Sequence, residues 1–334
     1  MQIINVPTGK IIITESSSGK LMECVSLGDY GKEKNVKAPF LGLTKDIEGV
    51  PHGELMPLSE KWVITVSTQY GCSMNCKFCD VPKVGPGKNI FVQDILKQIS
   101  VAINEESCRK TKRLNIHFAR MGEPTWNLGV IAAAYNIPFL VDRYDLFCDT
   151  IHLVISTMLP RKNKQLVEFL QTWCFIKNDF YKGDAGLQFS INSTNNEQRE
   201  YLFSGSSLTL EEISEIGKSL PNPIGRKYAL NFALANNSII DGKRLQKLFS
   251  PDKFMCKITP LHETNACSKN GLITSNGYTS FTPYKEVEEN LIKNGFDTIV
   301  FVPSIEEDLG RITCGNAILS GTKPETEYSI VEKN

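Results

Sequence analysis

The 334-residue sequence lacks any run approaching the about 18 apolar residues that a membrane-spanning helix requires. Its first residues, MQIINVP, have neither the cationic lead nor the apolar segment of a secretion signal. Lysine plus arginine (37) equals aspartate plus glutamate (37), so the net charge gives no overall attraction to nucleic acid. We find no internal repeat and no low-complexity tract. These absences predict a soluble, cytoplasmic, globular protein with no membrane partner.

The composition, 41% hydrophobic and 22% charged, suffices for one large α/β domain with a small addition. Ten cysteines without a secretion signal indicate a reducing compartment, where thiols act as ligands or nucleophiles rather than in disulfides. Any RNA partner has to be held by local basic runs, of which 109–113 (RKTKR) and 161–164 (RKNK) are examples. Runs of this kind are more often solvated helix ends than binding sites.

Three cysteines lie close together in residues 71–79, GCSMNCKFC. Cys72, Cys76 and Cys79 supply three thiolates from one loop, whereas a [4Fe-4S] cluster normally takes four. One iron would be left open to bind a substrate or cofactor, as in a catalytic metal site. The alternatives are a zinc site or three unrelated buried thiols, but zinc usually takes CxxC pairs and a fourth ligand. The spacing therefore favours a catalytic iron–sulfur centre.

Short β-branched runs alternate with amphipathic segments from about residue 61 onward. This alternation predicts an α/β protein with parallel strands joined by right-handed crossovers. Six βα units are too few for the eight of a closed barrel, so we expect an open, partial (βα)6 barrel whose strand ends face a cleft. The expected strands are 62–67, 114–119, 150–156, 186–193, 228–235, 254–259 and 298–302, and the expected helices are 92–103, 128–140, 164–173, 210–220, 242–249 and 284–294.

The first 60 residues follow a different pattern. Residues 10–14 and 21–25, separated by a Ser/Gly turn, predict a β-hairpin, and the stretch from 29 to 60 has no clear period and is expected to be a loop or lid. We therefore expect an N-terminal hairpin and lid extension over 1–60, a barrel domain over 61–320 and a C-terminal tail over 321–334.

The CxxxCxxC spacing, with an aromatic residue before the last cysteine, resembles the signature of radical SAM enzymes, whose open iron binds S-adenosylmethionine. From the cluster loop to Ser320 the chain is similar to the radical SAM RNA methyltransferases that methylate adenosine at carbon 2 or carbon 8. That family comprises dual-specificity ribosomal and transfer RNA enzymes and their antibiotic-resistance relatives. The matches, in order, are 78–80 with Gly85, Lys88 and Asn89; 121–124 (MGEP) with Asn127; 154–157; 190–192; 196–199; and 295–300 leading to Cys314.

The resemblance implies a radical SAM barrel with a [4Fe-4S] cluster on the three loop cysteines and S-adenosylmethionine as cofactors. It further implies RNA as the substrate and a reductant such as flavodoxin or ferredoxin as a partner. Strand ends of a βα barrel converge on one rim, so the matching residues would surround one cleft. The positions that would hold the cofactor's amino, carboxylate and ribose groups are Gly122, Glu123, Ser156, Ser190 and Asn192.

Each serine or asparagine among these residues has an alternative interpretation as a helix cap. His262 falls near the position of a cofactor-binding asparagine in the family, and its alternative is an ordinary core or rim histidine. These alternatives stay open at the level of sequence.

Cys314 matches the family cysteine that is itself methylated. Adenine carbon 2 is too poor a nucleophile to take a methyl group directly, and a thiolate is a natural acceptor. In the family a radical from a second S-adenosylmethionine then activates that S-methyl group for addition to the base. Glu23 resembles the hairpin glutamate that removes the proton from the adduct, and its alternative is a solvated hairpin acid.

The chain also departs from the family pattern. Thr65 stands where the family has the cysteine that releases the crosslinked product, seven residues before Cys72. Cys24 and Cys267 are the alternative thiols, with Cys24 favoured because it adjoins Glu23. An accessory helical domain is missing before the hairpin, and residues 304–308 (SIEED) replace an Arg-Gly-Asp-like run.

The sequence therefore favours a radical SAM methyltransferase acting on RNA adenosine. One alternative is a radical SAM enzyme acting on a small molecule, nucleotide or peptide. The other is a non-catalytic iron–sulfur or zinc-binding protein.

Overall fold

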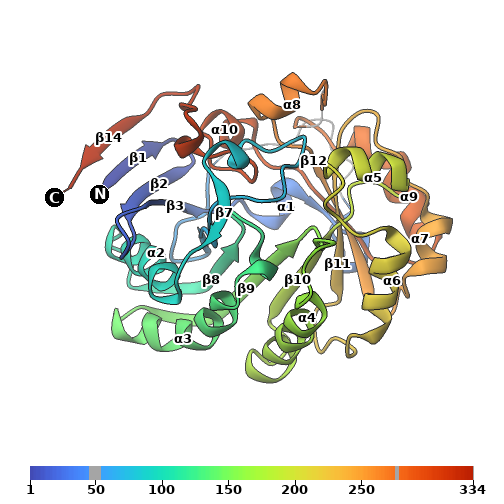
Figure 1. Ribbon diagram of the computed structural model, residues 1–334, viewed down its shortest axis with the longest axis horizontal. Helices are drawn as coiled ribbons and strands as arrows, with labels where there is room; N and C mark the ends of the chain where they lie inside the picture. The colour runs from blue at the N-terminus through green and yellow to red at the C-terminus, as the bar shows by residue number, and fades with distance from the viewer. Residues whose placement is uncertain (45–53, 275–277, 334) are drawn as a thin grey trace.

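A curved, mostly parallel β-sheet forms the centre of the protein (Figure 1). The computed structural model describes residues 1–44, 54–274 and 278–333. Seven strands lie side by side in chain order and pair in parallel, so each connection between them is a crossover. They are β5 (Trp62–Thr65), β8 (Lys110–Phe118), β9 (Phe147–Thr157), β10 (Ala185–Ser190), β11 (Tyr228–Leu234), β12 (Phe254–Pro260) and β13 (Thr298–Phe301).

The crossover helices pack on the outer, convex side of the sheet, as Figure 1 shows for α2, α3, α4, α6 and α7. Helix α6 begins with a complete capping box, in which the Thr209 hydroxyl accepts from the Glu212 N–H and Glu212 reaches back to the Thr209 N–H. The helices are α2 (Val92–Asn104), α3 (Gly129–Arg143), α4 (Leu166–Phe175), α5 (Asn196–Leu202), α6 (Leu210–Ser219), α7 (Gly242–Leu248), α8 (Asn265–Lys269), α9 (Lys285–Lys293) and α10 (Ile305–Leu309). A mixed α/β fold with a large, mostly parallel sheet is confirmed.

Several element boundaries differ from the expected ones. The fourth parallel strand, expected to continue to residue 193, ends at Ser190, because Asn192 adopts a left-handed backbone with φ of +57°. Helix α5 was not among the helices expected from periodicity, and it begins at residue 196, the first residue of the matching segment 196–199. Single short turns of other helix types occur at Pro39–Leu41, Val81–Lys83, Pro124–Trp126, Ile176–Phe180, Thr282–Tyr284 and Ile318–Ser320.

The N-terminal segment extends the same sheet by antiparallel strands. The expected hairpin forms from β2 (Gly9–Glu15) and β3 (Leu21–Gly28), with β1 (Gln2–Val6) on the far side of β2. Strand β3 pairs with β5 and so joins the hairpin to the parallel strands. Figure 1 shows both chain ends on this side of the molecule.

Two expected loops contain strands. The stretch expected to be a lid includes α1 (Lys32–Asn35) and β4 (Val36–Lys37), and β4 pairs with β13 at the other end of the sheet. Residues 45–53 of that stretch lie outside the described part. The expected tail contains β14 (Ser329–Glu332), which pairs with β1 and satisfies the backbone groups of an otherwise free edge. Helix periodicity and strand alternation fail for such short segments, because pairing with a neighbour decides their conformation.

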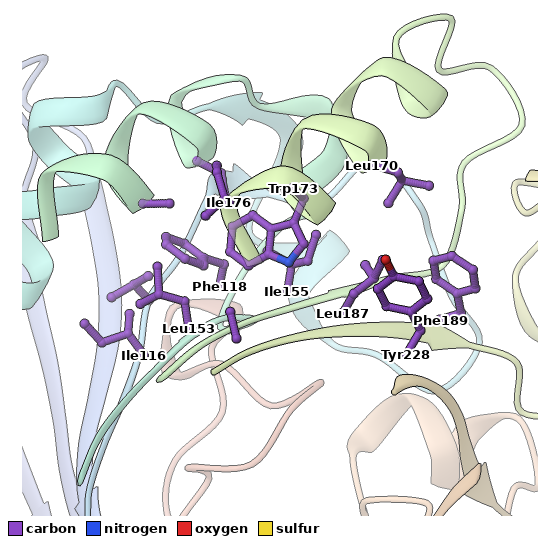
Figure 2. Packing of buried hydrophobic residues seen from close by; sticks show 14 of the residues in the cluster. Ile116, Phe118, Leu153, Ile155, Leu170, Trp173, Ile176, Leu187, Phe189 and Tyr228 are labelled. Atoms are coloured by element: carbon purple, nitrogen blue, oxygen red, sulfur yellow. The ribbon is translucent and has the colours of Figure 1, made fainter. Parts of the chain in front are cut away.

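The main core lies between the convex face of the sheet and the helices. Figure 2 shows Trp173 of α4 among side chains from successive strands, including Phe118, Ile155 and Leu187. The Trp173 ring meets Phe118 edge to face at 6.0 Å between centroids, and its Nε1–H donates to the Gly186 carbonyl at 3.0 Å. Strand residues that point outward are therefore buried by helices, which leaves the inward ones to form the concave face.

Trp173→Ala should destabilise the protein by about 3–5 kcal/mol, because a fully buried ring is replaced by a cavity and the Gly186 carbonyl loses its donor. Chemical denaturation measures this free energy of unfolding. Phe175→Ala on the same helix is the matched control, since that ring is 55% exposed and should change stability by about 0.5 kcal/mol or less. Equal losses in the two variants would contradict the assigned packing.

Among the described residues, no helix has the length and apolarity needed to cross a membrane.

Candidate active site

The three-cysteine loop is fixed at both ends by a small antiparallel ladder. Strands β6 (Gln69–Gly71) and β7 (Pro86–Asn89) pair with each other, and the Cys72 N–H donates to the Gly85 carbonyl at 3.1 Å. Gly87 has a φ of +84°, and a Cβ there would lie 2.4 Å from the Ser73 nitrogen. The ladder therefore needs glycine at this position and holds the loop in one conformation.

The three thiols lie inside an apolar shell. Cys72 and Cys76 pack against a cluster containing Met74, Met158 and Phe203, and the Cys76 and Met158 sulfur atoms are 3.7 Å apart. Cys72 and Cys79 pack against a second cluster containing Val81, Met121 and Ala317. This shell limits the access of water to the thiols, which is one of the properties that tune an iron–sulfur centre.

Burial raises the pKa of all three thiols, to about 11 for Cys72. Each thiolate also raises the pKa of its neighbours, because Cys72 and Cys79 interact electrostatically with Cys76 and with each other. A positively charged metal centre reverses this balance and holds coordinating thiols in the deprotonated form. The loop thus brings together three soft donors that need a cation to ionise.

Among the described residues, no three His, Cys, Asp or Glu side chains converge on one point as they would around a single metal ion. A [4Fe-4S] cluster does not require such convergence, since its cysteines bind different irons. Three thiols from one fixed loop, close enough for their charges to interact and enclosed by apolar residues, fit that cluster.

Cys314 lies directly beside this loop although it is distant in sequence. The Asp80 N–H donates to the Gly315 carbonyl at 2.8 Å, and a Cβ at Gly315, where φ is +88°, would lie 3.3 Å from the Phe78 oxygen. The negative charge of Cys314 contributes to the raised pKa of Cys79. The Cys314 side chain is exposed, and its Sγ is 3.6 Å from the Ala119 carbonyl oxygen just beyond β8. The structure therefore brings the candidate methyl carrier next to the cluster cysteines.

A buried ion pair supports the segment that carries Cys314. Glu23 accepts from the Arg120 Nε at 2.8 Å and from the Leu319 N–H at 3.0 Å, and it is 0% exposed. Arg120 also donates to the carbonyl oxygens of Arg311 at 2.7 Å and Thr313 at 3.1 Å. The alternative of a solvated hairpin acid is wrong for Glu23, because both of its oxygens are used within the protein.

Arg120→Met should destabilise the protein by about 3–5 kcal/mol, because it leaves the Glu23 carboxylate buried without its partner. Lys112→Met is the control. It removes an exposed ion pair with Glu60 that solvent screens, so the loss of stability should be much smaller than for Arg120→Met. Urea denaturation of both variants tests the difference, and a similar loss in each would show that the Glu23–Arg120 pair has no special structural role.

The Gly-Glu element lies next to the cysteine loop. Gly122 has a φ of +97°, and its close contact with Gln69 leaves no room for a Cβ. Glu123 accepts from the Thr125 hydroxyl at 2.7 Å and from the Met158 N–H at 3.0 Å, while burial raises its pKa. Its charge contributes to the raised pKa of Cys72 and Cys76.

Ser156, Ser190 and Asn192 lie at the carboxyl ends of β9 and β10, on the same rim. Ser156 donates to Gln188 at 3.3 Å, and the Asn192 side-chain oxygen accepts from the Ala233 N–H at 3.0 Å. None of the three caps the helix that follows its strand, because α4 begins at Leu166 and the cap of α5 is Asn195. The helix-cap alternative is therefore wrong for these residues.

His262 is fixed by a carboxylate that also contacts the segment of Cys314. Its Nδ1 lies 2.9 Å from Asp308, which in turn accepts from the hydroxyl groups of Tyr278 and Thr313. Burial would raise the pKa of Asp308, but His262, Thr313 and Tyr278 hold it below its usual range. His262 is thus an oriented rim residue with its Nε2 directed away from Asp308.

The two alternative thiols occupy different environments. Cys24 is fully buried in the main core, its thiol faces the Gln98 carbonyl at 3.6 Å, and burial raises its pKa to about 12. Adjacent strand residues point to opposite faces, so Cys24 points away from the site and the preference for it is wrong. Cys267 is buried but adjoins the cysteine loop, with its sulfur 3.7 Å from the Phe78 oxygen. Thr65 lies on the concave face in register with His117.

Sequence reasoning missed Asp308 and three polar residues of the concave face, His117, Asn231 and Lys257. Their signal is a polar residue at an alternate position of an otherwise apolar strand, as in YALNFAL and FMCKITP. Alternating polar and apolar residues predict the strands, and the polar residues of this pattern are the ones that line the concave face.

Known proteins of similar sequence are RNA methyltransferases. The chain is 24% identical over 218 residues to the dual-specificity RNA methyltransferase RlmN of Geotalea uraniireducens. The matched region covers 64% of this chain and 58% of that protein. It is 27% identical over 241 residues to the probable dual-specificity RNA methyltransferase RlmN of Aquifex aeolicus, and this match covers 68% of this chain and 64% of that protein. The matches thus span less than two thirds of these relatives. No protein-family model matches the chain.

Among solved structures, a radical SAM methyltransferase from Sphaerobacter thermophilus matches with a TM-score of 0.56 at 16% identity, over 92% of this chain and 77% of that one. This likeness supports the fold. The sequence matches show that the chain is distantly homologous to the dual-specificity RNA methyltransferases, as the motif order predicted.

Proposed function

We propose that this protein is a radical SAM methyltransferase that modifies RNA adenosine through a methyl group carried on Cys314. The observation that carries the proposal is the packing of the Cys314 segment on the three-cysteine loop, through the Asp80–Gly315 hydrogen bond and the close approach of Gly315 to Phe78. Sequence similarity to the RNA methyltransferases supports the same assignment.

Cys72, Cys76 and Cys79 would hold the [4Fe-4S] cluster, and the rim residues would hold S-adenosylmethionine. Bound together, these groups supply a 5′-deoxyadenosyl radical. We assign contacts with the cofactor to Gly122, Glu123, Ser156, Ser190, Asn192 and His262. The apolar shell around the loop limits the access of water to this centre.

Cys314 has to lose its proton in order to accept a methyl group. Desolvation by the surrounding protein atoms raises the pKa of its thiol, and the positive charges of Arg120 and Lys257 act against this shift. Its exposed side chain is accessible to a methyl donor and then to a substrate. We assign to Glu23 the positioning of this segment through Arg120, while a role as the base would require it to leave that ion pair.

The rim position of one basic run supports RNA as the substrate. Lys162 and Lys164 are exposed in the loop after β9, on the rim that carries Ser156. The other run, residues 109–113, lies at the opposite end of β8, where Arg113 pairs with Asp184. We therefore propose that residues 161–164, rather than 109–113, contact RNA at the site. We further propose a cytoplasmic location with a flavodoxin- or ferredoxin-type reductant, in line with ten free cysteines.

Mass spectrometry of the protein after anaerobic incubation with S-adenosylmethionine tests the methyl-carrier role. We expect the peptide containing Cys314 to gain the mass of one methyl group and the other cysteine peptides to remain unchanged. Reductive cleavage of the cofactor, measured as 5′-deoxyadenosine, tests the radical chemistry separately. An unmodified Cys314 in protein that cleaves the cofactor would contradict methyl transfer and retain the radical SAM assignment.

A further inference from the structure

The concave face of the sheet is lined by half-exposed side chains at alternate strand positions. In β10, β11 and β12 the outward residues are buried, whereas Gln188, Ser190, Asn231 and Lys257 are only partly covered. Ser190 pairs in register with Asn231, and Asn231 pairs with Lys257. These three side chains therefore form a polar row across neighbouring strands, level with a residue of the candidate cofactor rim.

Lys257 is the charged member of this row. Within the described residues no carboxylate forms an ion pair with its ammonium group, which lies 5.2 Å from the centre of the Phe301 ring. Other cations at this face have partners: Lys61 pairs with Asp29, and Arg113 pairs with Asp184. None of the seven parallel strands carries an Asp or Glu at an inward position in its described range.

Lys257 and other basic side chains act on His117, which lies on the concave face. Burial lowers the pKa of His117 to about 3, and the charges of His152, Lys257, Lys61 and Arg113 lower it further. Burial also lowers the pKa of Lys257, with a smaller contribution from Arg226. A half-buried ammonium group among other cations is costly without an anion beside it.

Lys257 also interacts electrostatically with the exposed thiol of Cys314: the Lys257 charge lowers the pKa of Cys314, and the Cys314 charge raises that of Lys257. A molecule that receives a methyl group from Cys314 has to occupy the adjacent part of the concave face. Its acidic groups would then come within reach of Lys257.

We propose that Lys257 binds an anionic oxygen group of the methyl-accepting substrate, namely the phosphate of a nucleotide unit, and so positions that unit against Cys314. This inference rests on the proposed function and adds a recognition residue to it. A lysine ammonium recognises a phosphate as a point charge with three donors. The carboxylate of S-adenosylmethionine is the other anionic oxygen group that a lysine at this position could bind. We favour the substrate because Lys257 lies three strands from Ser156 and two strands from Ser190, roughly 14 Å and 10 Å at the spacing of strands in a sheet.

Equilibrium dialysis with anaerobically reconstituted protein tests this role, using AMP, adenosine and inorganic phosphate as probes. We expect AMP to bind about tenfold or more tightly than adenosine, and phosphate to compete with AMP. Lys257→Gln should remove the preference for AMP, and Lys257→Arg should retain most of it. Lys247→Gln removes the same charge from the outer helix α7 and should leave the preference unchanged.

Equal affinity of the wild type for AMP and adenosine, or no binding of AMP, would overturn the proposal, as would a preference that survives in Lys257→Gln. Dialysis with S-adenosylmethionine tests whether Lys257 binds the cofactor carboxylate instead of the substrate phosphate. If Lys257→Gln no longer binds S-adenosylmethionine, Lys257 is a cofactor contact and the proposal is overturned. The production of 5′-deoxyadenosine by the wild type is measured in parallel. If it persists while AMP shows no preference, the substrate inference fails and the radical SAM function stands.

Discussion

Cys76→Ala is expected to eliminate both the iron–sulfur cluster and the cleavage of S-adenosylmethionine. The loop offers three thiolates, already one fewer than the usual four, and the variant leaves only two. The Cys76 thiol also packs against the apolar shell, beside the Met158 sulfur, where no other donor replaces it among the described residues. Iron and sulfide content after anaerobic reconstitution measure assembly, and electron paramagnetic resonance with and without S-adenosylmethionine reports on the open iron.

Cys108→Ala is the control for this experiment. Cys108 is a half-exposed thiol whose sulfur contacts the Lys110 carbonyl, far from the loop in the fold, and its loss should leave iron content unchanged. Full iron content in Cys76→Ala, with cofactor cleavage at the wild-type rate, would exclude the three-cysteine loop as the cluster site. Iron loss in both variants would indicate a general effect of cysteine removal on folding.

The parallel part of the fold follows from the sequence because its strands and helices have regular periods. Leu153 and Ile155 are buried toward the helices and Ser156 faces inward, so one strand already shows which side carries the cleft. Segments whose conformation depends on a distant partner were missed. Strands β4 and β14 are short and form only because β13 and β1 offer free edges.

The candidate site was predictable where local spacing carries the chemistry. The cysteine loop and the Gly-Glu element are contiguous in sequence, and the structure places both on one side of the concave face. The contacts among Glu23, Arg120 and the Cys314 segment join three distant parts of the chain. No local pattern shows whether an acid such as Glu23 is buried in an ion pair or exposed as a base, because that depends on which segments pack around it.

The position of Cys314 leads to a prediction that separates radical formation from methyl transfer. Cys314→Ala should retain reductive cleavage of S-adenosylmethionine and lose methylation of RNA. The thiol is exposed and is not among the three loop ligands, so its removal leaves the cluster ligands and their apolar shell in place. Methylation fails because the variant has no nucleophile to receive the first methyl group.

The measurement combines chromatography of 5′-deoxyadenosine with counting of radiolabelled methyl groups in RNA. Cys267→Ala is the matched control, since Cys267 also adjoins the cysteine loop but is buried with its thiol on the His262 and Phe78 carbonyl oxygens. We expect that variant to transfer the first methyl group to Cys314. If Cys267 releases a crosslinked product, a protein–RNA adduct resistant to denaturation will accumulate in that variant alone. Normal RNA methylation by Cys314→Ala would show that Cys314 carries no methyl group. Its side chain would then contribute only to packing beside the loop.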